Sequence, residues 1–168
     1  TLNGAGVEWF KARAHLADAH TVVLRDTETG DEKTVTADKI LLATGGYPTV
    51  PAIPGAELAI TSNEAFHLEA LPEQVVVYGG GYIAVEFACI FAGLGAKTHL
   101  VYRGDRPLRG FDEDLRQFFH EQLDNHENLT LHMGETITAM AKASDGTIDV
   151  TLGSGASLKV NQAMFATG

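Results

Sequence analysis

The sequence of 168 residues contains a single cysteine, Cys89, and few cations. One cysteine excludes both an intrachain disulfide and a C-x-x-C redox pair. Only 12 lysine and arginine residues stand against 22 aspartate and glutamate residues, which gives a net charge of −10 at pH 7. Nucleic acids and anionic membrane surfaces attract clustered cations, so this balance argues against either partner. An anionic ligand must therefore meet a local basic site.

Long apolar runs and metal-ligand spacings are missing as well. No stretch reaches the roughly 18 to 20 apolar residues that span a bilayer, and no basic segment followed by an apolar one opens the chain. These absences predict a cytoplasmic protein. The seven histidines show no H-x-x-x-H or Cys/His spacing, so we expect no metal site. The chain has no initiating methionine and soon enters strand-like sequence, which suggests a piece of a longer protein.

What is present indicates a globular fold with an internal repeat. Hydrophobic residues make up 45% of the chain and charged residues 20%, the balance of a protein with one or two cores. Residues 21–45 align with residues 147–168. Each copy has an alternating strand, a Gly-containing turn, a second strand and an apolar run that ends in Ala-Thr-Gly. The repeat predicts two β-meanders, each leading into a buried strand.

A linker and a short helix separate the first copy from the rest. Residues 46–54 contain three prolines, which forbid a regular helix and favour extended backbone. Thr61 and Glu64 then form a T-x-x-E capping box, in which hydroxyl and carboxylate satisfy free backbone N–H groups at a helix start. These signals predict an interdomain linker followed by a new domain.

The middle of the chain predicts a βαβ unit. Residues 75–78 form a short apolar run typical of a buried parallel strand, three glycines follow, and residues 97–103 form the second strand. The helix between the strands has an apolar stripe at helical spacing, formed by Ile83, Phe87, Ile90 and Leu94. A second helix begins at the acidic residues 112–114, and its expected apolar face consists of Leu115, Phe118, Phe119 and Leu123.

The glycine turn has the pattern of a dinucleotide-binding site, Gly79-x-Gly81-x-x-Ala84, between a strand and a helix. Gly79 permits the tight turn, and Gly81 lets the backbone approach a pyrophosphate with no Cβ in the way. Ala84 is small enough for close packing of helix on strand. The helix N-terminus then offers N–H groups and a positive dipole end to phosphates. The alternative is a tight strand-to-helix turn without a ligand.

The end of the second strand indicates which nucleotide is bound. An NAD site places Asp or Glu there, on the ribose 2′-hydroxyl, whereas this chain has Arg103, with Arg109 six positions further on. Guanidinium groups can hold a 2′-phosphate by charge-assisted hydrogen bonds, so the sequence favours NADP over NAD. Asp105 leaves an alternative open, in which it pairs with Arg103 or Arg106 on an ordinary surface loop.

Taken together, these segments resemble the glutathione reductase family of flavoprotein disulfide reductases. Residues 79–115 resemble that family's NADPH-binding βαβ unit, and residues 36–55 resemble its FAD-domain segment and linker. With residues 161–168, the resemblance covers essentially the whole chain. It implies an α/β fold: a Rossmann-like, three-layer NADPH-binding domain with a parallel sheet and a β-meander, flanked by a partial FAD-domain segment.

The resemblance also implies domain boundaries and a role for each site residue. The expected divisions are residues 1–50 (FAD-domain segment), 51–61 (linker), 62–161 (NADPH-binding domain) and 162–168 (return towards the FAD domain). The expected cofactor contacts are Gly80 and Ile83 on NADPH, Tyr82 as a lid over the nicotinamide pocket, Glu86 near the carboxamide, Arg103 and Arg109 on the 2′-phosphate, Gly168 on NADPH at the domain junction, and Thr44 on FAD. Alternatively, Tyr82 is an exposed residue of the first helical turn and Glu86 a solvated helix charge. The two Ala-Thr-Gly ends then simply terminate strands.

Some family features have no counterpart in this sequence. The Gly-rich FAD fingerprint, the C-x4-C redox disulfide and the His-Glu acid/base pair are absent, so no catalytic residue is assigned. Cys89 lies within an apolar helix, where a buried structural thiol is expected. In the complete enzyme the resemblance implies hydride transfer from NADPH to FAD for reduction of oxidised glutathione, in a homodimer. The chain alone is expected not to reduce a disulfide.

Two rival functions stay open. One is a sister reductase that acts on dihydrolipoamide, a mercuric ion or another small disulfide; the two arginines weaken the dihydrolipoamide option, because that branch uses NAD. The other is a Rossmann-like nucleotide-binding module without flavin chemistry. The proline-rich linker and the paired Ala-Thr-Gly segments argue against such a module, because they are expected where a chain crosses into and out of a flavin domain.

Overall fold

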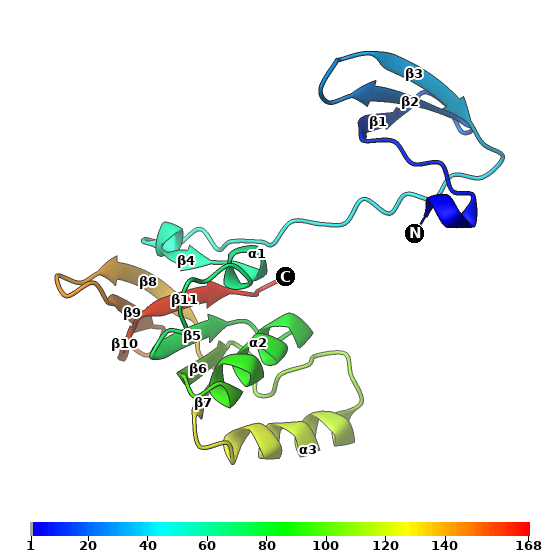
Figure 1. The fold of residues 1–168 in the computed structure, drawn as a ribbon. Helices are drawn as coiled ribbons and strands as arrows, with labels where there is room; N and C mark the ends of the chain where they lie inside the picture. The colour runs from blue at the N-terminus through cyan, green and yellow to red at the C-terminus, as the bar shows by residue number, and fades with distance from the viewer. Residues whose placement is uncertain (1) are drawn as a thin grey trace. The chain divides into compact units, whose positions relative to one another are not determined.

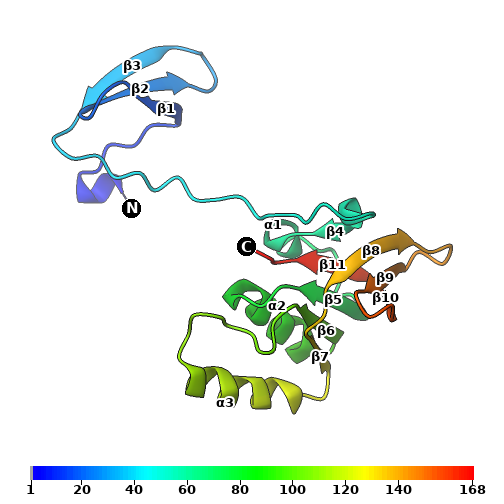
Figure 2. The ribbon, with the colours of Figure 1, turned by 180° about the vertical axis from the view of Figure 1, so that it is seen from behind.

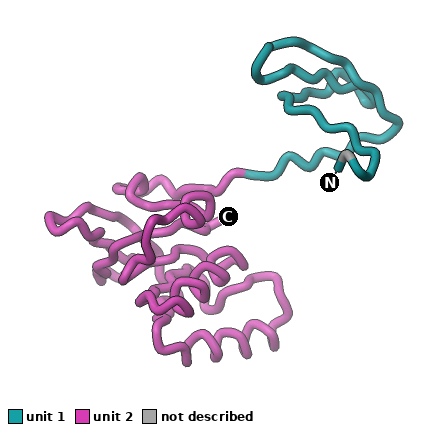
Figure 3. The backbone as a smooth tube through the Cα atoms, viewed as in Figure 1, with its two compact units in different colours: residues 1–46 teal, residues 47–168 magenta. Residues whose placement is uncertain are grey.

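The computed structural model describes residues 2–168, apart from the side chain of Asn3. It divides the chain into two compact units, residues 1–46 and 47–168 (Figure 3). The division falls slightly before residue 50, where the first domain segment was expected to end. No helix among the described residues is long and apolar enough to cross a membrane.

The first unit is a small antiparallel sheet. A 3₁₀ turn, η1 (Asn3–Ala5), precedes β1 (Ala12–Leu16), β2 (Thr21–Asp26) and β3 (Glu32–Thr36), which lie in that order in the sheet (Figure 1). The carboxylate of Asp26 accepts hydrogen bonds from the backbone N–H groups of Glu28 and Thr29, at 2.7 and 2.8 Å, and so shapes the turn between β2 and β3. Every described residue of this unit is at least partly exposed, so it has no buried core.

The apolar run at residues 40–44 is not a buried strand, and the expectation of two equivalent meanders is wrong in this respect. The run has no regular secondary structure, and the side chains of Leu41 and Leu42 are 89% and 66% exposed. Its counterpart in the repeat forms β11 (Gln162–Phe165), which pairs with a strand on each side. A strand needs neighbours to take up its backbone hydrogen bonds, and no described residues supply them to residues 40–44.

The second unit is built on a parallel sheet of five strands, which confirms the predicted α/β class. The strand order is β4 (Ala59–Ile60), β11, β5 (Gln74–Tyr78), β6 (Lys97–Tyr102) and β7 (Leu129–Met133). A 3₁₀ turn, η2 (Ala56–Leu58), leads into β4. Strands β4 and β11 therefore come from the stretches expected to be a linker and a return segment, and both belong to this sheet.

The layers of the second unit follow from the alternation along its strands. Val75 and Val77 of β5 face α2 (Tyr82–Gly93), while Val76 faces the opposite side. That opposite side is covered by an antiparallel meander of β8 (Ile137–Lys142), β9 (Ile148–Leu152) and β10 (Ser157–Val160), as Figure 2 shows. Helices, parallel sheet and meander form the three layers that the family resemblance implies.

The helices begin where expected but are rotated relative to the predicted faces. Helix α1 (Ser62–Ala65) has the Thr61 and Glu64 capping box, and Asp112 caps α3 (Glu113–Asp124). The residues of α2 that are buried are Ala84, Val85, Phe87, Ala88, Phe91 and Ala92, while Ile90 and Leu94 are largely exposed. In α3, Leu123 is buried as predicted, but Leu115 and Phe118 are half exposed or more and Arg116 is buried instead. Small alanines bring α2 close to the sheet, and hydrogen bonds allow Arg116 to be buried.

Candidate functional site

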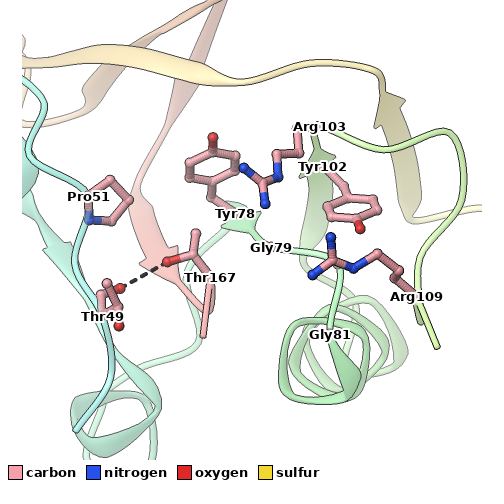
Figure 4. A pocket seen from close by; sticks show the side chains of 10 residues that line it. Thr49, Pro51, Tyr78, Gly79, Gly81, Tyr102, Arg103, Arg109 and Thr167 are labelled. Atoms are coloured by element: carbon pink, nitrogen blue, oxygen red, sulfur yellow. Dashed lines mark hydrogen bonds between the residues drawn. The ribbon is translucent and has the colours of Figure 1, made fainter.

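A pocket of about 510 Å³ lies at the carboxyl ends of the parallel strands (Figure 4). Its walls come from the ends of β5, β6 and β11, the loop after β6 and the segment before η2. The lining residues are Thr49, Pro51, Tyr78, Gly79, Gly80, Gly81, Tyr102, Arg103, Arg109 and Thr167. Strand order runs from β5 to β6 and β7 on one side and to β11 and β4 on the other. Open α/β sheets bind ligands in the crevice at such a reversal of strand order.

The three glycines of the turn have different tasks. Gly79 has φ +151°, and a Cβ there would lie 2.1 Å from the carbonyl oxygen of Ala166. A Cβ on Gly80 would lie 2.3 Å from the ring of Tyr102. Gly81 has φ −80°, and a Cβ there would meet nothing within 4 Å. The first two glycines are therefore required for the turn itself, whereas Gly81 keeps open the space in front of it.

The N-terminus of α2 opens at this turn. Gly81 is its N-cap and provides no side-chain hydrogen bond to the helix. The backbone N–H of Val85 bonds to the carbonyl of Gly81, so the N–H groups of the three residues before Val85 have no intrahelical partner. Free N–H groups and the positive end of a twelve-residue helix make this a favourable position for an anion.

Arg103 and Arg109 supply the positive charge of the pocket. Arg103 follows the last residue of β6, Arg109 follows on the loop, and both guanidinium groups turn into the pocket (Figure 4). Asp105 pairs with Arg106 at 3.4 Å and lies 3.8 Å from Arg116. Among the described residues, no carboxylate lies within 4.0 Å of Arg103 or Arg109. Of the two pairings left open by the sequence, the structure has the one with Arg106.

Of the residues expected at the site, the pocket brings together Gly79, Gly80, Gly81, Arg103 and Arg109. The expected residues outside its lining are Tyr82, Ile83, Ala84, Glu86, Gly168 and Thr44. Tyr82 begins α2 with 59% of its surface exposed, and Glu86 is exposed one turn later. Ala84 is fully buried, and its Cβ would be 3.1 Å from a Cβ on Gly79. Ile83 is partly buried against the core.

The remaining two expected residues lie at other places in the chain. Gly168 is the exposed last residue, one position beyond the pocket-lining Thr167, with φ +111°. Thr44 is an exposed residue of the first unit, in the irregular stretch after β3. Both positions are compatible with a ligand contact, and neither is buried in the protein core.

The structure adds pocket residues that the sequence reasoning missed. The ring of Tyr102 lies against Gly80 and Gly104, where a Cβ on either would come within 2.5 Å of it. The hydroxyl of Thr167 donates a 2.9 Å hydrogen bond to the carbonyl of Thr49. Tyr102 could have been noticed, since it is the last residue of a predicted strand beside the glycine turn. The bond between Thr167 and Thr49 joins residues 118 positions apart, and no local pattern announces it.

The chain's single thiol does not take part in this site. Cys89 is partly buried on α2, where it packs against the core between the parallel sheet and its helices, called here the helix-side core. Burial raises the pKa of the Cys89 thiol, which makes the reactive thiolate scarcer. Within residues 2–168, no group of three or more histidine, cysteine, aspartate or glutamate side chains could hold a metal ion.

Comparison with known proteins agrees with this geometry. The family described as pyridine nucleotide-disulphide oxidoreductase matches residues 3–168. A glutathione reductase from Nostoc sp. is 45% identical over 145 residues, which covers 86% of this chain and 30% of that protein. A trypanothione reductase from Leishmania donovani is 40% identical over 169 residues, which covers 97% of this chain and 34% of that protein. The chain spans about a third of the length of these curated relatives.

Solved structures share the fold at low sequence identity. A flavoprotein disulfide reductase induced by HOCl in Escherichia coli has a TM-score of 0.77 at 24% identity, over 94% of this chain and 35% of that one. An engineered water-forming NADPH oxidase bound to NADPH has a TM-score of 0.71 at 24% identity, over 94% and 36%. Its parent, the Lactobacillus brevis NADH oxidase bound to NADH, has a TM-score of 0.71 at 23% identity, over 93% and 36%.

Proposed function

Because the chain belongs to the pyridine nucleotide-disulphide oxidoreductase family, we propose that it is the NADPH-binding part of a flavin-dependent glutathione-disulfide reductase. One observation carries the proposal. Two guanidinium groups without a carboxylate partner among the described residues, Arg103 and Arg109, line the same pocket as a glycine turn at a helix N-terminus. A dinucleotide with a third phosphate needs both kinds of anion site at once.

The residues of the pocket fit NADPH. Free N–H groups at the start of α2 and the open space at Gly81 suit the pyrophosphate, which must approach the backbone closely. Arg103 and Arg109 suit the 2′-phosphate, because guanidinium forms charge-assisted and bidentate hydrogen bonds with phosphate. In this proposal Gly80 and Ile83 contact NADPH through the turn, which Gly79 and Ala84 shape. Tyr82 covers the nicotinamide, Glu86 lies near the carboxamide, and Gly168 approaches the cofactor from the end of β11.

The engineered oxidase provides an independent parallel for the choice of NADPH. Its five substitutions include glycine to alanine and, nineteen and twenty-five positions later, two changes to arginine. Ala84, Arg103 and Arg109 have the same spacing in this chain. The variant also loses an aspartate one position before its first new arginine, where this chain has Tyr102. An alanine and two arginines at this spacing therefore also occur in a protein described as an NADPH oxidase.

The flavin part of the proposal concerns residues 1–50, as a segment of an FAD domain in which Thr44 contacts FAD. In the whole enzyme, NADPH would supply a hydride, FAD would accept it, and oxidised glutathione would be reduced. The described residues bind and orient the nucleotide. We place the enzyme in the cytoplasm as a homodimer. The alternative substrate is another disulfide, because the Leishmania donovani relative is described as a trypanothione reductase; the higher identity to the Nostoc protein favours glutathione.

The test is a titration of NADPH and NADH on the chain at fixed ionic strength, because salt screens a phosphate contact. The variant replaces both arginines by uncharged residues of similar length, Arg103→Met with Arg109→Leu. Charge-assisted hydrogen bonds contribute about 1.5 to 3 kcal/mol each, so the loss of even one weakens NADPH binding about ten- to a hundredfold. The double variant should lose at least this much affinity for NADPH. NADH lacks the 2′-phosphate and should bind almost as before. Equal losses for both nucleotides would mean that the arginines support the fold, and the proposal would fail.

A further inference from the structure

The loop of residues 104–111 carries Arg109 and connects β6 to α3. Residues other than Arg103 and Arg109 hold this loop in place. It has no regular secondary structure, yet Pro107 at its centre is fully buried. We infer that Arg116 and Leu108 are positioning residues that set the relative placement of Arg103 and Arg109, and thereby the preference for a 2′-phosphorylated nucleotide. The inference rests on the proposed function and adds the residues that determine its specificity.

Arg116 holds the loop through its backbone. Its side chain is only 9% exposed, its Nε donates to the carbonyl of Pro107 at 2.9 Å, and its Nη2 donates to the carbonyl of Arg106 at 2.8 Å. Its Nη1 donates to Glu113 on the same helix at 2.5 Å, which fixes the guanidinium plane. The planar fork thus grips two consecutive carbonyls that lie between the two phosphate-binding residues, a geometry that an ammonium group cannot reproduce.

Leu108 holds the loop from the other side. It has φ +59° and is the only non-glycine residue among the described ones with a positive φ. Its N–H donates to the carbonyl of Gly80 at 2.6 Å, and its side chain packs against the helix-side core. A left-handed conformation is unfavourable for a residue with a Cβ, so the surrounding contacts must enforce it. This turn comes directly before Arg109 and is tied to the glycine that lines the pocket.

The acidic residues of this region also pair with arginines outside the pocket. Arg106 and Arg116 take up the carboxylates of the region, Asp105 and Glu113, at separations up to 3.8 Å. Partial burial raises the pKa of Asp105, but the hydrogen bond and the charge of Arg106 lower it overall. The Asp105 carboxylate is therefore charged and would attract any nearby guanidinium. The two inner arginines therefore keep these acids away from the pocket, and the 2′-phosphate meets no competing carboxylate.

A purely structural role would leave the preference between nucleotides unchanged, and this separates the two explanations. A buried arginine is costly compared with an apolar residue of similar volume, so core packing alone does not account for Arg116. The readout is the ratio of the NADPH and NADH dissociation constants, measured by titration of the chain, with the thermal midpoint of each variant measured in parallel.

The first variant is Arg116→Lys, which keeps the charge and removes the fork. We expect NADPH to bind about tenfold more weakly, because the two arginines lose their mutual register, and NADH to change by less than about threefold. The matched control is Arg25→Lys, the same exchange at an exposed arginine of β2 in the first unit. It should leave the ratio within about twofold of the parent value.

The second variant is Leu108→Gly, which decides the matter if Arg116→Lys does not fold. Glycine adopts φ +59° without strain but no longer restricts the loop, so the ratio should fall about two- to fivefold. A folded Arg116→Lys or Leu108→Gly variant with the parent ratio would overturn the inference, as would equal weakening of both nucleotides. If the parent chain itself does not distinguish NADPH from NADH, the proposed function fails, whatever the variants do.

Discussion

Gly81 differs from the two glycines before it, because a side chain there would point into open space at the pocket. Its φ of −80° suits any residue, so Gly81→Ala should fold, with a loss of about 1 kcal/mol or less at the helix N-cap. The added methyl group would stand where a pyrophosphate approaches the backbone. We expect binding of NADPH and NADH to fall together by at least about tenfold, measured by titration, with little change in the thermal midpoint.

Gly79→Ala is the comparison for this variant. Its Cβ would collide with the carbonyl of Ala166, and φ +151° is unfavourable for alanine, so the chain itself should be destabilised. A Gly81→Ala protein that binds both nucleotides normally would show that the pyrophosphate does not lie at this turn. Loss of folding in both variants would show that Gly81 is also needed for the turn.

His99 on β6 and His132 on β7 predict a pH dependence of stability. Nδ1 of His99 lies 3.1 Å from Nε2 of His132. Burial lowers the pKa of both imidazoles; the charge of His132 lowers the pKa of His99 further, while Glu135 partly offsets the effect on His132. The unfolded chain therefore binds more protons near the ordinary histidine pKa of about 6.5, so this contribution is complete above that pH and is lost as the pH falls below it.

The measurement is the urea midpoint at pH 7.5 and at pH 5.5, a range in which carboxylates stay ionised. We expect a lower midpoint at pH 5.5, and a smaller difference between the two pH values in His99→Gln. His15→Gln, an exposed histidine of the first unit, should leave the difference unchanged. The same pH effect in His99→Gln and in the parent chain would contradict the assignment.

At the scale of elements, α2 shows where sequence patterns succeed and where they do not. Its start, length and place between two parallel strands follow from apolar runs and glycines, because these are local properties. Its buried face does not, because a pattern of large apolar residues favoured Ile90 and Leu94, while close approach to the sheet selects Ala84, Ala88 and Ala92. Alanine carries little weight in a periodicity, yet it fits the narrowest part of the interface.

This rotation of α2 predicts an unequal response to two substitutions. Ala88 is fully buried, so Ala88→Leu should lower the free energy of unfolding by about 1 to 3 kcal/mol through overpacking. Ile90 is about half exposed, and Ile90→Ala should cost about 1 kcal/mol or less. Urea unfolding of both variants at pH 7.5 measures the difference. A larger loss for Ile90→Ala than for Ala88→Leu would favour burial of the face with Ile90 that the periodicity predicts.

The pocket divides in the same way between local and distant contributions. Gly81, Arg103 and Arg109 were predictable because the spacing of a glycine turn and a strand end is short and chemically specific. Thr49 and Thr167 were not, because they meet only after the sheet has formed. Arg116 was missed for a different reason. From the sequence an arginine on a helix is expected to be solvated, and only its carbonyl partners explain its burial.

At the scale of the whole molecule, the two units differ in what stabilises them. The second unit has cores on both faces of its sheet, whereas the described residues of the first unit include none that is buried. Backbone with little burial opens easily, so limited proteolysis should cut within residues 1–45 well before residues 62–160. Mass spectrometry of the early fragments identifies the order. Equal rates of cleavage in both regions would show that the first unit has a protection that its exposure does not indicate.

The central place of β11 also has a consequence for the order in which the protein can be made. This strand, residues 162–165, lies between β4 and β5, which are synthesised about a hundred residues earlier. Until β11 leaves the ribosome, β4 and β5 each present an unpaired edge, and the nascent sheet is open at its centre. A nascent chain therefore cannot close its parallel sheet, or bring Thr167 to the pocket, before residues 162–165 have been synthesised.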